Sequence, residues 1–401
     1  MRPNFPKALM KNPFGARLPA IDSRTLTDTI ARALASAGLD TRSGTMRSVS
    51  DTIQRALSSS GLAASAQPAA PVIDIGARVV DAVVDRPADA PGHPAAGRPA
   101  ARGSFVSREF ANHAGRRAYK LYAPVRAPGT PMPIVVMLHG CTQSADDFAA
   151  GTRMNRLADA HGFLVVYPEQ AAHANVSKCW SWFKAQDQVR DAGEPALIAG
   201  IVHDVARQHD ADARRVFVAG LSAGAAMAVI LGETYPELFA AVGAHSGLPY
   251  GSAHDIPSAM AAMKGGRSGL PGLKNPPAAP RRTLSQAVPT IVFHGDRDAT
   301  VQPSNGTAIV EQAIAAHSAA AGEARLRVST QQGQAPSGRG YTRTVHADAG
   351  GRPRIEAWTL HGAGHAWSGG DPGGSYADAN GPDASAEMVR FFLSQPRAGS
   401  A

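Results

Sequence analysis

The sequence predicts an α/β protein built on a doubly wound, mostly parallel β-sheet. From about residue 104, short apolar stretches typical of buried strands alternate with segments of helical periodicity. One apolar stretch, at 214–222, runs through Gly-Leu-Ser-Ala-Gly directly into a helical pattern, which is a strand–turn–helix unit. Residues 1–103 contain no Trp or Tyr and include a stretch rich in Ala, Pro and Gly. We therefore predict an N-terminal extension at 1–103 and a folded domain at 104–396.

The apolar runs and the helical patterns define the expected elements of the folded domain. We expect strands at 118–124, 133–140, 162–170, 214–222, 239–247, 289–298 and 354–365. We expect helices at 153–161, 193–209, 223–235, 303–320 and 383–394. Strands that are apolar throughout are buried on both faces, so helices must cover both sides of the sheet. Ligands of such sheets bind at the carboxyl ends of the strands, where several polar residues of this chain lie.

The N-terminal extension carries a short internal repeat. The segment at 27–39 returns at 50–62 with nine of 13 positions identical. Each copy begins with Thr or Ser followed by Asp and ends in Gly-Leu, which predicts two short capped helices ahead of a flexible linker. Three roles stay open: a self-packed helical hairpin or docking arm, attachment to a hydrophobic polymer or granule surface, and contact with a partner protein.

Composition excludes several classes of function. The net charge is +8 over 401 residues, but no dense Lys/Arg run with interleaved aromatic residues is present, so we expect no nucleic-acid partner. No apolar stretch approaches 18 residues, so we expect no membrane span, and the N-terminus has no apolar core of a signal peptide. There is no His-Glu-x-x-His motif, Walker loop or Rossmann glycine pattern, so we expect no metal and no cofactor.

Ser222 is the candidate nucleophile. It lies between the expected strand and the helix at 223–235, where a sharp turn lifts the hydroxyl group away from the sheet. Gly220 and Gly224 leave room for the close crossing of strand and helix, and the helix N-terminus favours developing negative charge. A serine hydroxyl needs a base, and in this arrangement an acid and then a histidine follow it along the chain.

Two acids and two histidines compete for those roles. Asp296 and Asp298 follow the strand at 289–298, and we favour Asp298 because it lies deeper in the turn. His361 and His365 follow the last expected strand, and we favour His365 because Gly-Ala-Gly precedes it. His365 then takes the proton from Ser222, while Asp298 fixes the tautomer of the imidazole.

A tetrahedral intermediate needs hydrogen-bond donors for its oxyanion. The backbone N–H of Ala223, directly after the nucleophile, is one expected donor. The second is expected from the loop after the strand at 133–140, at Cys141 or at its neighbour Thr142.

Several stretches together resemble the polyhydroxybutyrate-depolymerase-type esterases of the α/β-hydrolase superfamily. They are HGCTQSADDFAAGTRMNRLADAHGFLVVYPEQ (139–170), KCWSWF (178–183), GLSAGAAMA (220–228), HSGLPYG (245–251), HGDRDATVQPSNG (294–306) and GAGHAWSGG (362–370). The resemblance covers about residues 105–395. It implies the α/β-hydrolase fold and a serine esterase that forms an acyl-enzyme on Ser222 and cleaves a poly(3-hydroxybutyrate)-type polyester. The alternatives are a feruloyl or acetyl-xylan esterase and a hydrolase-fold protein that only binds.

The resemblance also implies a disulfide between Cys141 and Cys179, which are the two cysteines of the chain. Such a bridge stiffens the oxyanion loop and points to an oxidising, extracellular compartment. Two reduced cysteines in a cytoplasmic protein are the alternative, because no signal peptide is visible.

Aromatic residues near these motifs have two interpretations. Trp180, Trp182 and Trp367 either line the substrate site as an apolar wall or pack in the core. The segment 250–287, rich in Gly and Pro, is an insertion between two strands that either covers the site as a lid or forms a surface loop.

Overall fold

The computed structural model of the chain describes residues 103–125, 129, 131–266, 287–320 and 325–395. The repeated helices expected at 27–39 and 50–62 lie outside the described residues, as do residues 267–286 of the insertion at 250–287. The division of the chain near residue 103 therefore stays a prediction. In the described part, no helix is long and apolar enough to cross a membrane.

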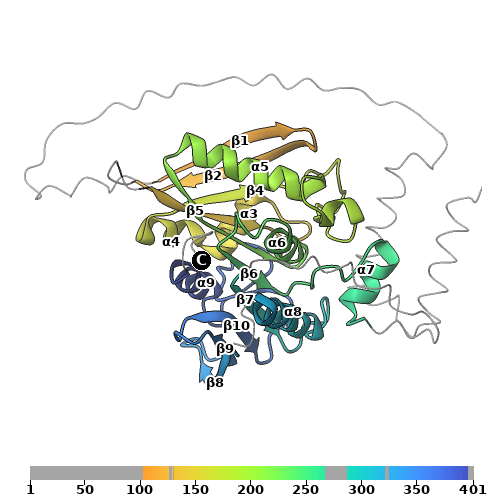
Figure 1. Ribbon diagram of the computed structural model, residues 1–401, viewed down its shortest axis with the longest axis vertical. Helices are drawn as coiled ribbons and strands as arrows, with labels where there is room; N and C mark the ends of the chain where they lie inside the picture. Colours follow the sequence, from red (N-terminus) through yellow and green to blue (C-terminus); the bar gives the residue numbers. More distant parts are fainter. Residues whose placement is uncertain (1–102, 126–128, 130, 267–286, 321–324, 396–401) are drawn as a thin grey trace, which may run out of the picture. The chain divides into compact units, whose positions relative to one another are not determined.

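A ten-stranded sheet forms the centre of the domain (Figure 1). Its strands, in spatial order, are β1 (Ser104–Asn112), β2 (Gly115–Ala123), β4 (Leu164–Pro168), β3 (Met132–Leu138), β5 (Ala211–Leu221), β6 (Ala241–His245), β7 (Thr290–Gly295), β10 (Pro353–Leu360), β9 (Gly340–Ala347) and β8 (Arg327–Gln334). From β4 to β10 all neighbouring strands run parallel. Every strand expected from the sequence is present, and the predicted fold class is confirmed.

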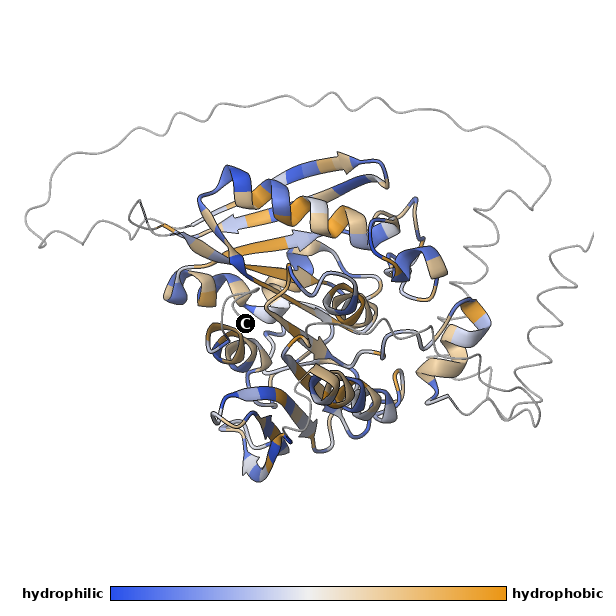
Figure 2. Cartoon of the chain, in the orientation of Figure 1, coloured by the Kyte–Doolittle hydropathy of each residue, from blue (hydrophilic) through white to orange (hydrophobic). Residues whose placement is uncertain are grey.

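Successive side chains of the central strands point to opposite faces of the sheet, so the core has two layers. In β3, Ile134, Val136 and Leu138 face one cluster, whereas Val135 and Met137 face the other. Helices α5 (Gly193–Gln208), α6 (Ala223–Thr234) and α8 (Ser304–Ala320) contribute to the first cluster. Helices α3 (Ala145–Thr152), α4 (Met154–His161) and α9 (Ala384–Leu393) contribute to the second (Figure 1). The central strands are accordingly hydrophobic on both faces (Figure 2).

The outer strands are antiparallel, and the sequence did not predict β1, β8 and β9. β1 pairs antiparallel with β2, and β8 and β9 extend the sheet beyond β10. The side chains of β8 are almost all exposed and read RVSTQQGQ. A strand without a buried face carries no apolar alternation that the sequence could reveal. β8 forms through its pairing with β9 rather than through local propensity.

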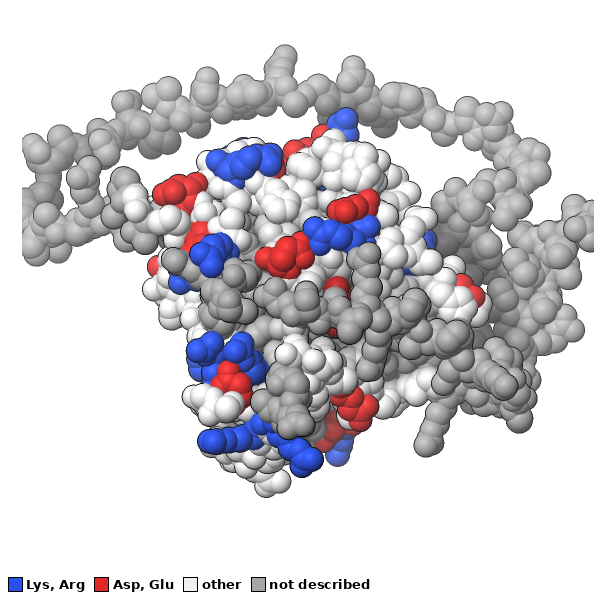
Figure 3. Space-filling view, viewed as in Figure 1, with Lys and Arg blue, Asp and Glu red and all other residues white. Residues whose placement is uncertain are grey.

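Four short elements complete the described part. Helix α7 (Ile256–Met263) lies within the insertion at 250–287 and begins with a capping box between Asp255 and Ser258. A 3-10 turn, η1 (Ala185–Gln188), precedes α5, and a small parallel pair joins β11 (Trp367–Ser368) to β12 (Ala377–Asp378). On the face seen in Figure 3, basic and acidic side chains are interspersed over the surface, as in an ordinary solvated surface.

The strand order places the site. The chain passes from β3 to β4 on one side, and β5 then lies on the other side of β3. This reversal places the topological switch point at the carboxyl ends of β3 and β5, which is where open α/β sheets bind ligands. The loop after β3 begins at His139, and Ser222 directly follows β5.

Candidate active site

Ser222 occupies a strained turn between β5 and α6. Its backbone has φ 57° and ψ −119°, a conformation that L-residues rarely adopt. The turn is held because the Ser222 N–H donates to the carbonyl oxygen of His245 at 2.9 Å. A Cβ atom at Gly220 would collide with the backbone of Gly224, and one at Gly224 would collide with the carbonyl of Leu138. Gly220 is therefore required where β5 meets α6, and Gly224 where α6 crosses the end of β3.

His365 pairs with the buried carboxylate of Asp298. The Nδ1 atom of His365 lies 2.7 Å from Oδ2 of Asp298, whose side chain is fully buried. The other carboxylate oxygen accepts the N–H groups of Thr300 and Val301, each at 2.9 Å. Burial alone raises the pKa of Asp298, but the hydrogen bonds from His294 and His365, the charge of His365 and the Val301 N–H outweigh it. The pKa of Asp298 therefore lies well below its usual range, and the carboxylate stays ionised.

The competing acid and histidine pair with each other. Asp296 Oδ2 lies 3.2 Å from Nδ1 of His361, and Asp296 Oδ1 accepts the N–H of Gly362 at 2.7 Å. The Nε2 atom of His361 lies 2.9 Å from the hydroxyl oxygen of Thr342. This second pair is exposed, at 45% for the His361 side chain and 39% for Asp296, whereas the carboxylate of Asp298 is buried. Asp298 thus pairs with His365, and Asp296 pairs with His361.

His245 links the histidine loop to the serine turn. It pairs with Leu221 across β5 and β6, directly before Ser222. Its Nε2 atom accepts the N–H of Ser368 at 3.0 Å, and its ring stacks on Trp367 with centroids 5.2 Å apart. The segment that follows His365 is therefore fixed against the strand that flanks Ser222. The carboxyl ends of β5, β7 and β10 lie at one edge of the sheet, so Ser222, Asp298 and His365 share that edge.

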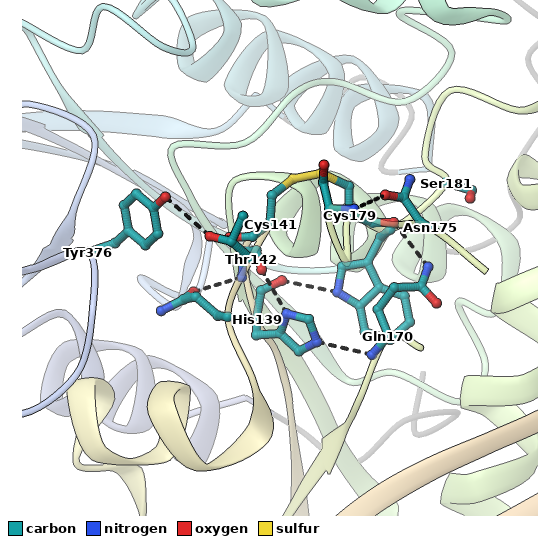
Figure 4. The surroundings of a disulfide bond; sticks show 12 residues. His139, Cys141, Thr142, Gln170, Asn175, Cys179, Ser181 and Tyr376 are labelled. Carbon is teal, nitrogen blue, oxygen red and sulfur yellow. Dashed lines mark hydrogen bonds between the residues drawn. A yellow bond between two sulfur atoms is a disulfide. The ribbon is translucent and has the colours of Figure 1, made fainter. Parts of the chain in front are cut away.

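The expected oxyanion residues follow two neighbouring strands, β3 and β5. Ala223 is the first residue of α6. Cys141 lies in the loop after β3 and forms the predicted disulfide with Cys179 (Figure 4). The next residue, Thr142, has φ 67° and donates its N–H to the carbonyl of Ser177 at 2.7 Å. That N–H is already engaged in this conformation.

The three tryptophans expected near the substrate are buried. Trp180, Trp182 and Trp367 are 0%, 6% and 2% exposed. The indole N–H of Trp180 donates to the carbonyl of His139 at 3.0 Å, and that of Trp367 donates to Ser385 Oγ at 3.0 Å. These contacts favour core packing, the alternative interpretation, over an exposed apolar wall.

Two further histidines lie at the site, and the sequence did not predict them as site residues. His245 lies behind Ser222, and His294 lies 3.5 Å from Asp298 Oδ2 while its Nε2 is 2.9 Å from the carbonyl of Val301. Each lies at the carboxyl end of an apolar strand, in the sequences HSG and FHGD. That position was the sequence feature that could have identified them as site residues. Among the described residues, no cluster of three or more His, Cys, Asp or Glu side chains is arranged to hold a metal ion.

Comparison with known proteins places the chain in a family. The profile of the family described as esterase PHB depolymerase matches residues 117–332, more than half of the chain. A poly(3-hydroxyalkanoate) depolymerase C from Paucimonas lemoignei is 34% identical over 58% of this chain and 54% of its own length. A probable acetylxylan esterase A from Aspergillus flavus is 33% identical over 36% of this chain and 46% of its own length. The chain thus spans about half the length of these curated relatives.

A solved structure agrees in fold. The acetyl xylan esterase from Aspergillus awamori superposes with a TM-score of 0.53 at 19% identity, covering 73% of this chain and 100% of that one. The strand–turn–helix unit at Ser222 and the sheet order are those of an α/β hydrolase. On the extent of the profile match, this chain belongs to the PHB depolymerase esterase family.

Proposed function

We propose that this protein is a serine esterase that hydrolyses carboxylic esters through an acyl-enzyme on Ser222. The single observation that carries the proposal is the hydrogen bond between His365 and the buried carboxylate of Asp298, at the sheet edge where the strained Ser222 turn lies. Strained backbone and strongly shifted pKa values cluster at catalytic sites, so a strained serine and an ionised, buried carboxylate bonded to a histidine at the same sheet edge favour catalysis over binding alone.

Each residue then has one task in the reaction. Ser222 Oγ attacks the ester carbonyl carbon while Nε2 of His365 takes the hydroxyl proton, and the carbonyl electron pair moves to the oxygen. His365 returns that proton to the alcohol oxygen as the carbon–oxygen bond breaks, which leaves an acyl-enzyme. Water repeats both steps and releases the acid and free Ser222. Asp298 keeps the Nδ1 proton in place and stabilises the imidazolium.

The oxyanion is stabilised by two backbone donors. The N–H of Ala223 at the start of α6 is one, and the helix N-terminus adds its positive dipole end. For the second we choose Cys141 over Thr142, because the N–H of Thr142 donates to Ser177.

The substrate we propose is a poly(3-hydroxyalkanoate)-type polyester such as poly(3-hydroxybutyrate). The family profile and the depolymerase relative support this class. An acetyl or feruloyl ester of a polysaccharide is the second candidate. It is supported by the acetylxylan esterase relatives and by a feruloyl esterase B from Neurospora crassa that is 36% identical over 32% of this chain and 43% of its own length. Docking of the N-terminal extension on a polymer surface stays a prediction.

Product release from three substrates separates these candidates. Purified protein and its Ser222→Ala variant are incubated with a polyhydroxybutyrate film, acetylated xylan and methyl ferulate. Release of hydroxybutyrate from the film by the wild type alone supports the polyester assignment. Release of acetate or ferulate alone assigns the protein to the polysaccharide esterases, and turnover of none of the three refutes both candidates.

A further inference from the structure

A cluster of buried polar side chains lies behind the oxyanion loop, here residues 139–142. Arg117, Gln170, Asp187 and Glu194 are 5%, 0%, 3% and 6% exposed. None of them belongs to the proposed Ser222–His365–Asp298 machinery. Burying two carboxyl groups, a guanidinium group and an amide is costly unless each is well bonded, so their partners indicate their role.

Glu194 is the centre of this cluster. Its Oε2 atom accepts the backbone N–H of Ser181 at 2.7 Å, and its Oε1 atom accepts the side-chain amide of Gln170. The guanidinium group of Arg117 lies 3.7 Å from Oε1. Burial and the charge of Asp187 raise the pKa of Glu194 to about 7, and the bonds from Ser181 and Gln170 and the charge of Arg117 oppose the rise. The carboxylate form, which accepts at both oxygens, is the form that completes this bonding.

Gln170 carries the connection to the oxyanion loop. Its side-chain amide also donates to the carbonyl of Cys179 at 3.0 Å, and its backbone N–H donates to Nε2 of His139 at 3.0 Å (Figure 4). The indole of Trp180 donates to the carbonyl of His139 from the same side. The first residue of the oxyanion loop is therefore held through both its ring and its carbonyl group.

The far end of the loop is held by the same segment. Cys141 is bonded to Cys179, and Thr142 donates its N–H to Ser177. Residues 177–181 thus support the whole loop, and Glu194 fixes this segment at Ser181 directly and at Cys179 through Gln170. Glu194 itself lies in the first turn of α5, a helix packed in the core, where its N–H donates to Asp187 at 2.7 Å.

We propose that Glu194 is a positioning residue of the oxyanion site, which fixes the Cys141 N–H through Ser181, Gln170 and the segment 177–181. This inference rests on the proposed function, because it assigns Cys141 as an oxyanion donor. Oxyanion donors act only when they are aimed at the position that the developing charge will occupy, so a small shift of the loop costs turnover more than ground-state binding.

Glu194→Gln tests the proposal. The new NH₂ group must face either the Ser181 N–H or the side-chain amide of Gln170. Both of these are donors, so one of the two hydrogen bonds is lost. Glu356→Gln is the matched control. Glu356 is also a buried glutamate, bonded to Arg343 and Arg390, but it lies in the middle of β10 away from residues 177–181.

Kinetics with p-nitrophenyl butyrate give the first readout. For Glu194→Gln we expect kcat to fall at least about tenfold with KM within about twofold, and affinity for a boronic acid transition-state analogue to fall in parallel. For Glu356→Gln we expect a lower Tm and unchanged kcat. A loss of kcat in Glu194→Gln that is no larger than the loss in Glu356→Gln overturns the proposal.

Hydrogen exchange gives a second readout that does not depend on activity. The backbone amides of 139–142 should exchange faster in Glu194→Gln than in the wild type and in Glu356→Gln. If Glu194→Gln does not fold, Gln170→Met, which keeps the volume and removes the same bridge, takes its place. A wild type that turns over no ester refutes the proposed function, and unchanged exchange at 139–142 refutes the positioning role separately.

Discussion

The Nδ1 atom of His365 lies 2.7 Å from Oδ2 of Asp298, while Asp296, two residues earlier, bonds His361 instead. The carboxylate of the first pair is buried, and the second pair is exposed. Two acid–histidine pairs therefore lie on neighbouring loops, and burial distinguishes them. A buried, ionised carboxylate bonds an imidazole more strongly than an exposed one, which favours the Asp298 pair for proton transfer at the serine.

Asp298→Asn should lower kcat by about 10³-fold or more, because the amide no longer stabilises the imidazolium and favours the wrong tautomer. Asp296→Asn is the matched control, since it makes the same chemical change in the exposed pair. We expect its kcat to stay within about threefold of the wild type. Steady-state kinetics on a soluble ester compare the two, and a larger loss in Asp296→Asn would reverse the assignment.

Gly224→Ala should destabilise the fold, because the new Cβ meets the carbonyl of Leu138 where α6 crosses β3. We expect a loss of about 1–3 kcal/mol in the free energy of unfolding, the usual cost of overpacking a tight crossing. Gly364→Ala, where no heavy atom lies within 4 Å of the added Cβ, should leave the free energy of unfolding unchanged. Urea denaturation measures both, and equal midpoints would contradict the crossing.

Replacing both Cys141 and Cys179 by Ala should lower stability. The bridge closes a segment with a sequence separation of 38, so its loss should cost about 4 kcal/mol by the chain-entropy relation. Turnover should fall as well, because the oxyanion loop loses one of its fastenings to residues 177–181. Thermal melting and ester kinetics with and without dithiothreitol check this, with the double variant as the control that the reductant leaves unchanged. If dithiothreitol changes neither the Tm nor the kcat of the wild type, the disulfide does not stabilise the protein.

His245 should make the fold sensitive to acid. Burial first, and then the charges of His294 and His365, lower its pKa to about 3, against the opposing charge of Asp298. Its Nε2 atom accepts the Ser368 N–H, so the folded state holds the neutral ring. The unfolded chain binds this proton near pH 6.5 and the folded chain does not, so the stabilisation is present above pH 6.5 and is lost as the pH falls toward 3.

The measurement is the urea midpoint of the wild type and of His245→Gln between pH 6 and pH 4. The free energy of unfolding of the wild type should fall more steeply than that of the variant, by about 1.4 kcal/mol per pH unit. Parallel curves would show that His245 does not titrate differently in the two states.

The sequence predicted the parts of this molecule that burial controls. The central strands β3, β4 and β7 were found because their apolar runs are typical of strands buried on both faces. Apolar residues also mark β2 and β10, which are buried in part. The exposed β8 carries no such pattern and was missed. Ser222 was found because a strained turn between a strand and a helix requires glycines on both sides.

The choice between the acids and the histidines was weaker, because Asp296 and Asp298 differ in sequence by only two positions. Their burial, which separates them, arises from β10 pairing with β7 and is a tertiary property. The same holds for Glu194, whose partners Gln170 and Ser181 both lie in the segment between β4 and η1, outside the helix that carries Glu194. The three tryptophans could not be placed from the sequence either. An aromatic residue next to a motif packs in the core or lines the site, and the sequence does not distinguish the two orientations.

The most direct test of the account is covalent labelling of the nucleophile. The wild type and Ser222→Ala are treated with a fluorophosphonate, digested and examined by mass spectrometry, and the burst of p-nitrophenol from p-nitrophenyl butyrate is recorded in parallel. We expect one label per chain, on the peptide that contains Ser222, a burst of about one equivalent, and neither in the variant. A label on another residue, or a burst that survives in Ser222→Ala, would contradict the central claim that Ser222 forms the acyl-enzyme.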